Sequence, residues 1–224
     1  MSNNHLPLDK SHTGFEQVKD LLAKKMRIFL PPGALEQIAA CRKYLDDKID
    51  NSDALFYGIN TGFGFLQNVQ IDKTQLKELQ SNLIKSHACG MGEEVPADIV
   101  KLMIALKIKS LSYGHSGVET ATVERLMYMY NTDVLPVIYT QGSLGASGDL
   151  APLSHLSLPL LGLGEVNHAG KKMPAAEVLE KFNWKPIELK SKEGLALING
   201  TQFMSAYGLH NLIQCDRLIK WANI

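Results

Sequence analysis

The sequence predicts a mainly α-helical protein with a few short strands, and three observations support this fold class. Apolar residues recur at helical spacing over long stretches, most clearly in residues 97–111 and 119–131. Glycine-rich segments separate these stretches and predict loops. Strand-like segments are short, and they lie in the first part of the chain and near residues 164–172. We therefore expect a small mixed α/β part at the amino-terminal end, followed by helices.

The composition is that of an ordinary globular protein. The 224 residues include 23 Lys plus Arg and 23 Asp plus Glu, so the formal net charge is zero, and 45% of them are hydrophobic. Balanced charge without a basic stripe argues against a nucleic-acid partner. The most apolar run, residues 156–163, is short and is interrupted by Pro159. It is too short to span a membrane.

Cysteine use indicates a reducing compartment. Cys41, Cys89 and Cys215 lie far apart and form no CxxC pair. This arrangement is typical of reduced thiols in a cytoplasmic protein rather than of a disulfide framework. A zinc site would have to be assembled from scattered His and Cys residues, so we expect no metal.

The first part of the chain predicts one helix between irregular regions. Residues 1–32 are expected to form a polar leader and the start of the amino-terminal part, followed by a Pro-Pro-Gly turn. Residues 34–45 predict a helix because their apolar residues share one face. The polar residues 46–53 predict a connection, and residues 55–65, LFYGINTGFGF, predict a loop interrupted by glycines.

Three helices are predicted in the middle of the chain. The first begins after Thr74, which is positioned to cap it, and ends within residues 89–94, where two glycines stand. Its apolar face carries His87 next to Leu76, Leu79, Leu83 and Ile84. The helices at residues 97–111 and 119–131 follow.

A glycine-rich loop at residues 142–148 opens the last part of the chain. A helix is predicted from about Leu150, because a proline in its first turn removes no intrahelical hydrogen bond. Residues 164–172 predict a small hairpin and residues 173–182 a short helix.

The carboxyl-terminal segment predicts one more turn and one more helix. Residues 193–200, EGLALING, are expected to approach a turn, and residues 201–224 to form a long amphipathic helix. No capping pattern ends this helix, which is a hint that the chain is truncated. Its apolar surface would then be exposed, which favours self-association.

The segment richest in glycine, GSLGASGDLAPLSH at residues 142–155, fits none of the common catalytic loops. A nucleophile elbow requires G-x-S-x-G, but Asp149 stands two residues after Ser147. The glycine spacing matches neither the dinucleotide fingerprint nor a P-loop with its Lys. Taken by itself, the segment is interpreted as a glycine turn that leads into a helix.

As a whole block, however, residues 142–155 resemble the signature of the aromatic amino acid ammonia-lyase family. Three further blocks resemble that family in the same order: YGINTGFG at 57–64, SHACG at 86–90 and LINGTQ at 197–202. The resemblance implies a helical lyase fold, with residues 33–224 as the amino-terminal part of the catalytic domain. Family members are more than twice as long, so the carboxy-terminal helical part is expected to be absent from this chain.

In this family the triplet matched by Ala146, Ser147 and Gly148 cyclises to 4-methylideneimidazol-5-one, without an external cofactor. The amide nitrogen of Gly148 attacks the carbonyl carbon of Ala146, Ser147 loses its hydroxyl, and two waters leave. This chemistry explains the residue types, because Gly148 has no side chain to block the approach and Ala146 is small. An amide is a poor nucleophile, so the loop has to be held compressed.

The resemblance also assigns the residues that act on the substrate. Tyr57 would be the base that removes the β-proton, which requires an environment that stabilises its phenolate. Asn199 would orient the substrate or the new ring, and Gln202 would support the same network. Two plainer interpretations stay open: a packed aromatic for Tyr57, and a turn residue before Gly200 for Asn199.

The family places the residue matched by His87 against the aromatic side chain of the substrate. The pair Ser86-His87 resembles the histidine-specific members, which implies conversion of L-histidine to trans-urocanate and ammonia. A His also bonds a phenol, so a tyrosine ammonia-lyase or aminomutase stays open, as does a non-catalytic assembly module. His155, in the signature helix, is expected to pack near the loop.

The resemblance further implies assembly. Family members are homotetramers whose active sites draw residues from several subunits, and later segments supply the Arg that binds the substrate carboxylate. We therefore expect this chain alone to be inactive. The expected partners are an amino acid and further copies of the chain, with neither nucleic acid nor membrane.

Overall fold

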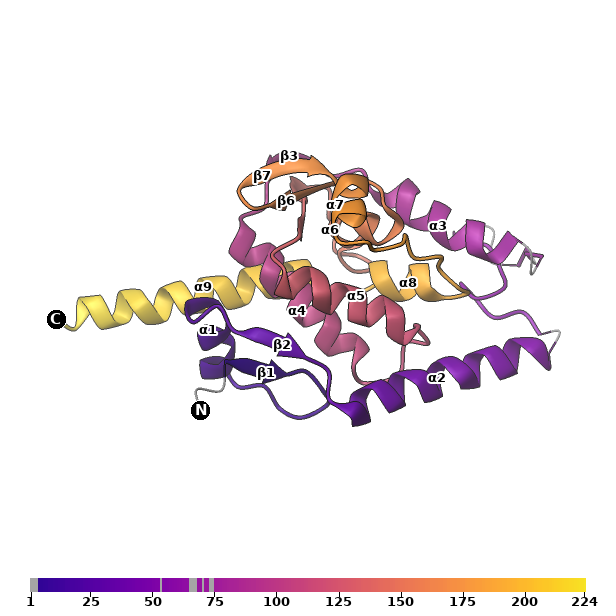
Figure 1. The fold of residues 1–224 in the computed structure, drawn as a ribbon, viewed down its shortest axis with the longest axis horizontal. Coiled ribbons are helices and arrows are strands. Elements are labelled where there is room, and N and C mark those ends of the chain that lie inside the picture. Colours follow the sequence, from indigo (N-terminus) through magenta and orange to yellow (C-terminus); the bar gives the residue numbers. More distant parts are fainter. Residues whose placement is uncertain (1–3, 53, 65–67, 70, 73–74) are drawn as a thin grey trace.

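Helices make up most of the computed structural model, which describes residues 4–52, 54–64, 68–69, 71–72 and 75–224 (Figure 1). The α-helices in chain order are α1 (Phe15–Ala23), α2 (Pro32–Asp50), α3 (Leu76–His87), α4 (Ala97–Leu111), α5 (Thr120–Asn131), α6 (Leu150–Ser157), α7 (Ala175–Lys181), α8 (Glu193–Ile198) and α9 (Gln202–Ala222). The 3-10 helix η3 (Leu158–Leu161) directly follows α6.

The strands in the described part of the chain are short and form small separate sheets. Strand β1 (His5–Pro7) pairs in parallel with β2 (Arg27–Phe29), and β3 (Met91–Glu94) pairs antiparallel with β5 (Tyr139–Gln141). The third sheet is antiparallel, in the order β4 (Leu135–Pro136), β6 (Glu165–His168), β7 (Lys171–Pro174). The predictions of a mainly helical fold with short strands, and of a hairpin at residues 164–172, are confirmed.

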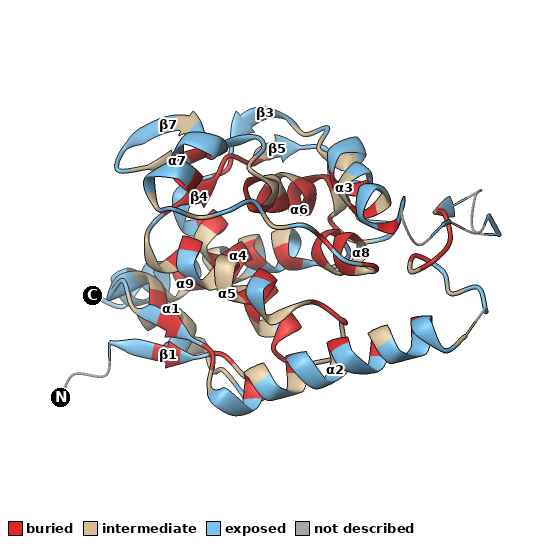
Figure 2. Cartoon of the chain, turned by 45° about the vertical axis from the view of Figure 1, so that its right-hand side comes forward, coloured by how far each residue is buried: buried red, intermediate tan, exposed pale blue. Residues whose placement is uncertain are grey.

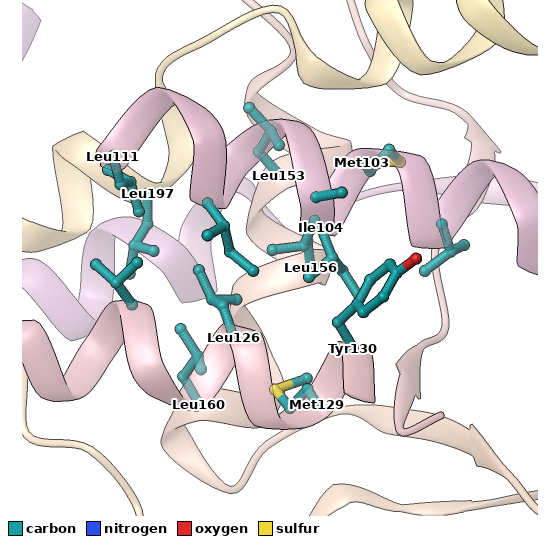
Figure 3. Close-up of a cluster of buried hydrophobic side chains, with 14 of the residues drawn as sticks. Met103, Ile104, Leu111, Leu126, Met129, Tyr130, Leu153, Leu156, Leu160 and Leu197 are labelled. Atoms are coloured by element: carbon teal, nitrogen blue, oxygen red, sulfur yellow. The ribbon is translucent and has the colours of Figure 1, made fainter. Parts of the chain in front are cut away.

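The core is centred on α4. Side chains from α4, α5, α6, η3 and α8 pack into one cluster, in which Ile104, Leu126, Leu156 and Leu197 are fully buried (Figure 3). Figure 2 shows the same concentration of buried residues in α4, α6 and α8. Each such side chain contributes about 1.5–3 kcal/mol relative to an exposed one. This packing fixes the start of α6 and the end of α8 relative to α4.

The helix α9 is packed at its start and exposed at its end. Ala206 is fully buried, whereas Leu218, Ile219 and Trp221 are largely exposed, and the end of the helix projects from the body (Figure 1). The expected exposure of apolar surface on this segment is therefore confirmed. In the described part of the chain, none of the helices has both the length and the apolar character needed to cross a membrane.

The helix α2 is longer than predicted. Residues 46–50, expected in a polar connection, continue the helix to Asp50. Ion pairs one turn apart, Arg42 with Asp46 and Lys43 with Asp47, support this extension, and Ile49 is buried. Polarity alone was therefore a poor guide to where this helix ends.

Two boundaries near the carboxyl end also differ from the prediction. Residues 193–198, expected on the approach to a turn, form α8, because Leu197 and Ile198 are drawn into the core. The helix predicted for residues 173–182 begins only at Ala175, since Met173 and the residue after it extend strand β7 opposite β6. Tertiary packing and strand pairing overrode the local pattern in both cases.

Residues 1–32 contain more regular structure than a polar leader suggests. They carry β1, α1 and β2, and the side chains of Leu6, Leu21 and Ile28 are buried. The domain boundary after residue 32 stays a prediction. Thr74, the predicted helix cap, lies outside the described residues.

Candidate active site

One open cavity of about 640 Å³ brings together residues that are far apart in the sequence. Tyr57 reaches it from the loop before α3, and His87 from the last turn of α3. Ser147 comes from the loop before α6, and Asn199 directly follows α8. Four of the predicted site residues therefore line the same cavity.

The loop that carries Tyr57 is held by its own side chains. The Asn60 amide donates a 2.8 Å hydrogen bond to the Ala54 carbonyl and accepts one of 2.6 Å from the Phe56 N–H. Gly58 has a φ of +68°, and a Cβ at this position would lie 2.7 Å from the side chain of Leu195. The positive φ favours glycine there, and the loop packs directly on α8.

Tyr57 stands at the mouth of the cavity with 55% of its surface exposed. Its ring meets that of Phe63 edge to face, with 6.0 Å between the centroids. The Gly64 N–H points to its hydroxyl oxygen at 3.5 Å, which is a long hydrogen bond. A main-chain N–H of the same loop therefore faces the phenol oxygen.

His87 is fixed to the end of α3 through one of its ring nitrogens. Nδ1 lies 2.9 Å from the Leu83 carbonyl oxygen and 3.1 Å from Ser86 Oγ. A carbonyl only accepts, so Nδ1 must carry the proton. In this tautomer Nε2 is the hydrogen-bond acceptor of the ring.

The loop with Ala146, Ser147 and Gly148 lies directly against the chain after α8. Gly148 has a φ of +99°, and a Cβ there would lie 2.6 Å from the Gly200 carbonyl oxygen. The N–H of Asp149 donates a 2.7 Å hydrogen bond to that same oxygen. No residue with a side chain fits at position 148 without moving one of the two segments.

Asp149 joins this loop to α9. Its buried carboxylate accepts a hydrogen bond of 3.0 Å from the Ser143 hydroxyl and one of 3.0 Å from the N–H of Met204. The Met204 N–H is one of the first four of α9, which have no partner within the helix. The carboxylate thus ties both ends of the loop to the start of that helix.

His155 links α6 to the segment after α3 and to β5. Its Nε2 accepts a 3.0 Å hydrogen bond from the Gly90 N–H, and its ring meets Tyr139 edge to face. Burial lowers the pKa of His155, which keeps that nitrogen available as an acceptor. The prediction that His155 packs near the loop is confirmed, since a Cβ at Gly142 would lie 3.0 Å from Gly90 Cα.

Three of the predicted site residues do not line the cavity. Ala146 is exposed, while Gly148 contacts Gly200. Gln202 is buried, and in the described part of the chain its Oε1 has no hydrogen-bond partner. Their assigned roles stay predictions. Within the described residues, no group of His, Cys, Asp and Glu is arranged to hold a metal ion.

The sequence interpretation missed a buried lysine beside the site. Lys107 of α4 is almost completely buried, and its Nζ lies 3.2 Å from the Ala196 carbonyl oxygen and 3.3 Å from that of Asn199. A signal was available, because Lys107 falls three or four residues from Met103, Ile104 and Leu111, on an otherwise apolar face of the helix. Charge on such a face indicates a specific partner.

The family model for aromatic amino acid lyases matches residues 14–224, so the chain belongs to the aromatic amino acid lyase family. It is 49% identical over 209 residues to the histidine ammonia-lyase of Deinococcus radiodurans. The aligned region covers 93% of this chain and 40% of that protein. The chain thus spans about two fifths of that relative's length.

Solved structures agree with this family. The histidine ammonia-lyase from Trypanosoma cruzi matches with a TM-score of 0.83 at 38% identity. The match covers 92% of this chain and 39% of that one. The tyrosine aminomutase from Streptomyces globisporus matches with a TM-score of 0.84 at 34% identity. The match covers 91% of this chain and 38% of that one. The predicted family and the helical lyase fold are both confirmed.

Proposed function

We propose that this chain is the part of a histidine ammonia-lyase that builds the electrophile and receives the substrate side chain. The whole protein would convert L-histidine to trans-urocanate and ammonia. One observation carries the proposal: Tyr57, His87, Ser147 and Asn199 line a single cavity. The 49% identity to a histidine ammonia-lyase supports the choice of substrate.

The residues present fit the prosthetic group that the family implies. Ala146, Ser147 and Gly148 would form 4-methylideneimidazol-5-one, with no external cofactor. The loop lies against Gly200 at the residue whose amide nitrogen would attack, and that residue has no Cβ. Asp149 anchors the loop from the other side. The group, when formed, supplies an electrophilic methylidene carbon.

The chain's own side chains then have distinct tasks. Tyr57 would accept the β-proton of the substrate, because its hydroxyl stands at the mouth of the cavity beside the Gly64 N–H. His87 would hold the imidazole of the substrate, accepting its N–H at Nε2. Asn199, which lines the same cavity, would orient the substrate, and Gln202 would support it.

A tyrosine-specific enzyme is the second candidate. The Nε2 acceptor of His87 suits the hydroxyl of a phenol as well as an imidazole N–H. The tyrosine aminomutase with a TM-score of 0.84 carries the same fold at 34% identity. Identity to the histidine ammonia-lyase is higher, at 49%, and favours histidine.

Assembly and location complete the proposal. The complete protein would be a cytoplasmic homotetramer, as the family resemblance implies. The exposed apolar residues at the end of α9 support burial against further helices. The chain alone would be inactive, because it spans about two fifths of its relative's length and the resemblance places the carboxylate-binding Arg in the remaining part.

The first test is the mass of the purified chain and of its peptide spanning residues 146–148. A deficit of two waters in that peptide supports the proposal, and a Ser147→Ala variant, which has no hydroxyl to lose, is the control. The second test replaces the matching segment of the Deinococcus radiodurans relative by this chain. Urocanate from histidine is the expected product. Coumarate or β-tyrosine from tyrosine would favour the second candidate, and no product together with an intact triplet would favour a non-catalytic module.

A further inference from the structure

Lys107 is a buried charged group for which the proposed chemistry has no use. It lies in the middle of α4, where its neighbours along the chain, Leu106 and Ile108, are apolar. Its Nζ donates to the carbonyl oxygens of Ala196 and Asn199 at the carboxyl end of α8. Burying a lysine is unfavourable unless its head group is bonded, so these two contacts define what the residue does.

We propose that Lys107 is a positioning residue, which holds the main chain of Asn199 and Gly200 in place for the cyclising loop. The effect on cyclisation rests on the proposed function. The two hydrogen bonds of Lys107 do not depend on it. The proposed role concerns the support of Asn199 rather than any contact with substrate.

The end of α8 needs an external donor. The last carbonyls of a helix have no N–H partner within it. The N–H of Asn199 bonds to the Leu195 carbonyl at 3.0 Å, and the chain then turns to an extended conformation at Asn199. The Asn199 carbonyl therefore points away from the hydrogen bonds of the helix. It accepts a hydrogen bond from Lys107 Nζ at 3.3 Å instead.

Two successive carbonyls are then held from two directions. Lys107 holds the carbonyl of Asn199, and the Asp149 N–H holds that of Gly200 at 2.7 Å. The first donor comes from the packed core helix α4 and the second from the loop itself. The distance between Gly148 and Gly200 consequently depends on where Lys107 places the Asn199 carbonyl.

Lysine suits this position because its flexible stem passes through apolar surroundings and ends in a small group with several N–H donors. Burial lowers the pKa of Lys107 to about 7, and the nearby Asp149 carboxylate opposes this shift. Even the neutral amine has two N–H bonds, one for each carbonyl. The contacts therefore persist in both protonation states.

The test compares Lys107→Met with Ile108→Val in this chain. Methionine keeps an apolar stem but has no donor, whereas Ile108→Val removes one buried methyl from the adjacent residue and leaves both carbonyls bonded. Hydrogen exchange is measured at the amides of Asp149 and Asn199. The amide of Thr132, which bonds to Tyr128 at the end of α5, is the internal reference.

We expect Lys107→Met to accelerate exchange at the amides of Asp149 and Asn199 about tenfold while leaving that of Thr132 unchanged. We also expect it to lower the fraction of chains that lack two waters at residues 146–148. Ile108→Val should lower the melting temperature without either change. Unchanged exchange in Lys107→Met, or equal acceleration in Ile108→Val, would overturn the proposal.

The exchange readout separates this inference from the proposed function. If the parent chain keeps its full mass but exchange responds to Lys107→Met, the positioning role stands and cyclisation within this chain fails. If the parent chain loses two waters and Lys107→Met loses them equally, cyclisation stands and the positioning role is wrong.

Discussion

The N–H of Asp149 lies 2.7 Å from the carbonyl oxygen of Gly200, and this hydrogen bond joins the glycine-rich loop before α6 to the chain that leaves α8. The two residues belong to separate sequence blocks. Their contact sets the distance between Gly148 and Asn199, and hence the geometry of the proposed cyclisation and of one cavity wall. Four predictions follow from this region and its supports.

Gly148→Ala should disrupt the loop far more than Gly145→Ala. Both glycines have positive φ, +99° and +78°, but only at Gly148 would a Cβ meet the Gly200 oxygen, at 2.6 Å. We expect a loss of about 3 kcal/mol in unfolding free energy for Gly148→Ala and about 1 kcal/mol for Gly145→Ala. Urea unfolding measures both, and equal losses would show that the close approach has no energetic weight.

Asp149→Ala should weaken the attachment of the loop to α9. It removes the acceptor for the Met204 N–H and for the Ser143 hydroxyl, which corresponds to about 1–3 kcal/mol. Asp149→Asn retains one acceptor oxygen and an amide that can donate to Ser143, so its loss should be about 1 kcal/mol. Urea midpoints that do not differ between the two variants would contradict this reading of the carboxylate.

Acid should destabilise the protein through His155. Burial lowers the pKa of this side chain below its ordinary value of 6.5, so the unfolded chain takes up the proton first as the pH falls. Stability contributed by neutral His155 is present above pH 6.5 and decreases below it, by at most ~1.4 kcal/mol per pH unit.

The control for His155 is His155→Gln, which keeps an acceptor for the Gly90 N–H but does not titrate. Melting temperatures are compared between the parent chain and this variant from neutral to acid pH. The difference between them should change as the pH falls below the ordinary pKa of histidine. A constant difference would rule out His155 as the titrating group.

Alkali should stabilise the protein through Lys107. Its pKa is about 7 in the folded chain and 10.5 when freely hydrated, so between these values the unfolded chain binds the extra proton. The unfavourable burial is fully present below pH 7 and is relieved as the pH rises toward 10.5, with a slope of at most ~1.4 kcal/mol per pH unit. Lys107→Met should flatten the plot of unfolding free energy against pH in this range. Urea titrations at several pH values measure it, and parallel plots for the parent chain and the variant would contradict the prediction.

Local sequence patterns predicted most elements but not all of their ends. The many apolar residues in residues 97–111 predicted α4 with the observed bounds, because a helix that is buried on most sides is apolar over most of its length. Residues 46–50 were read as a connection and residues 193–198 as the approach to a turn. Ion pairs in the first case and burial in the core in the second are contacts that a local pattern does not contain.

The site divides in the same way. The sequence by itself determined the family, because four blocks match it in order. It also singled out the triplet at residues 146–148 and Tyr57, His87 and Asn199 as candidate site residues. It gave no role to Lys107 or to the carboxylate of Asp149. Their partners include main-chain groups of segments distant in the chain. Every residue carries such groups, so the amino-acid type does not show which of them will be bonded. Only the tertiary structure decided which carbonyls lie beside the glycine-rich loop, since packing on α4 and the start of α9 places them there.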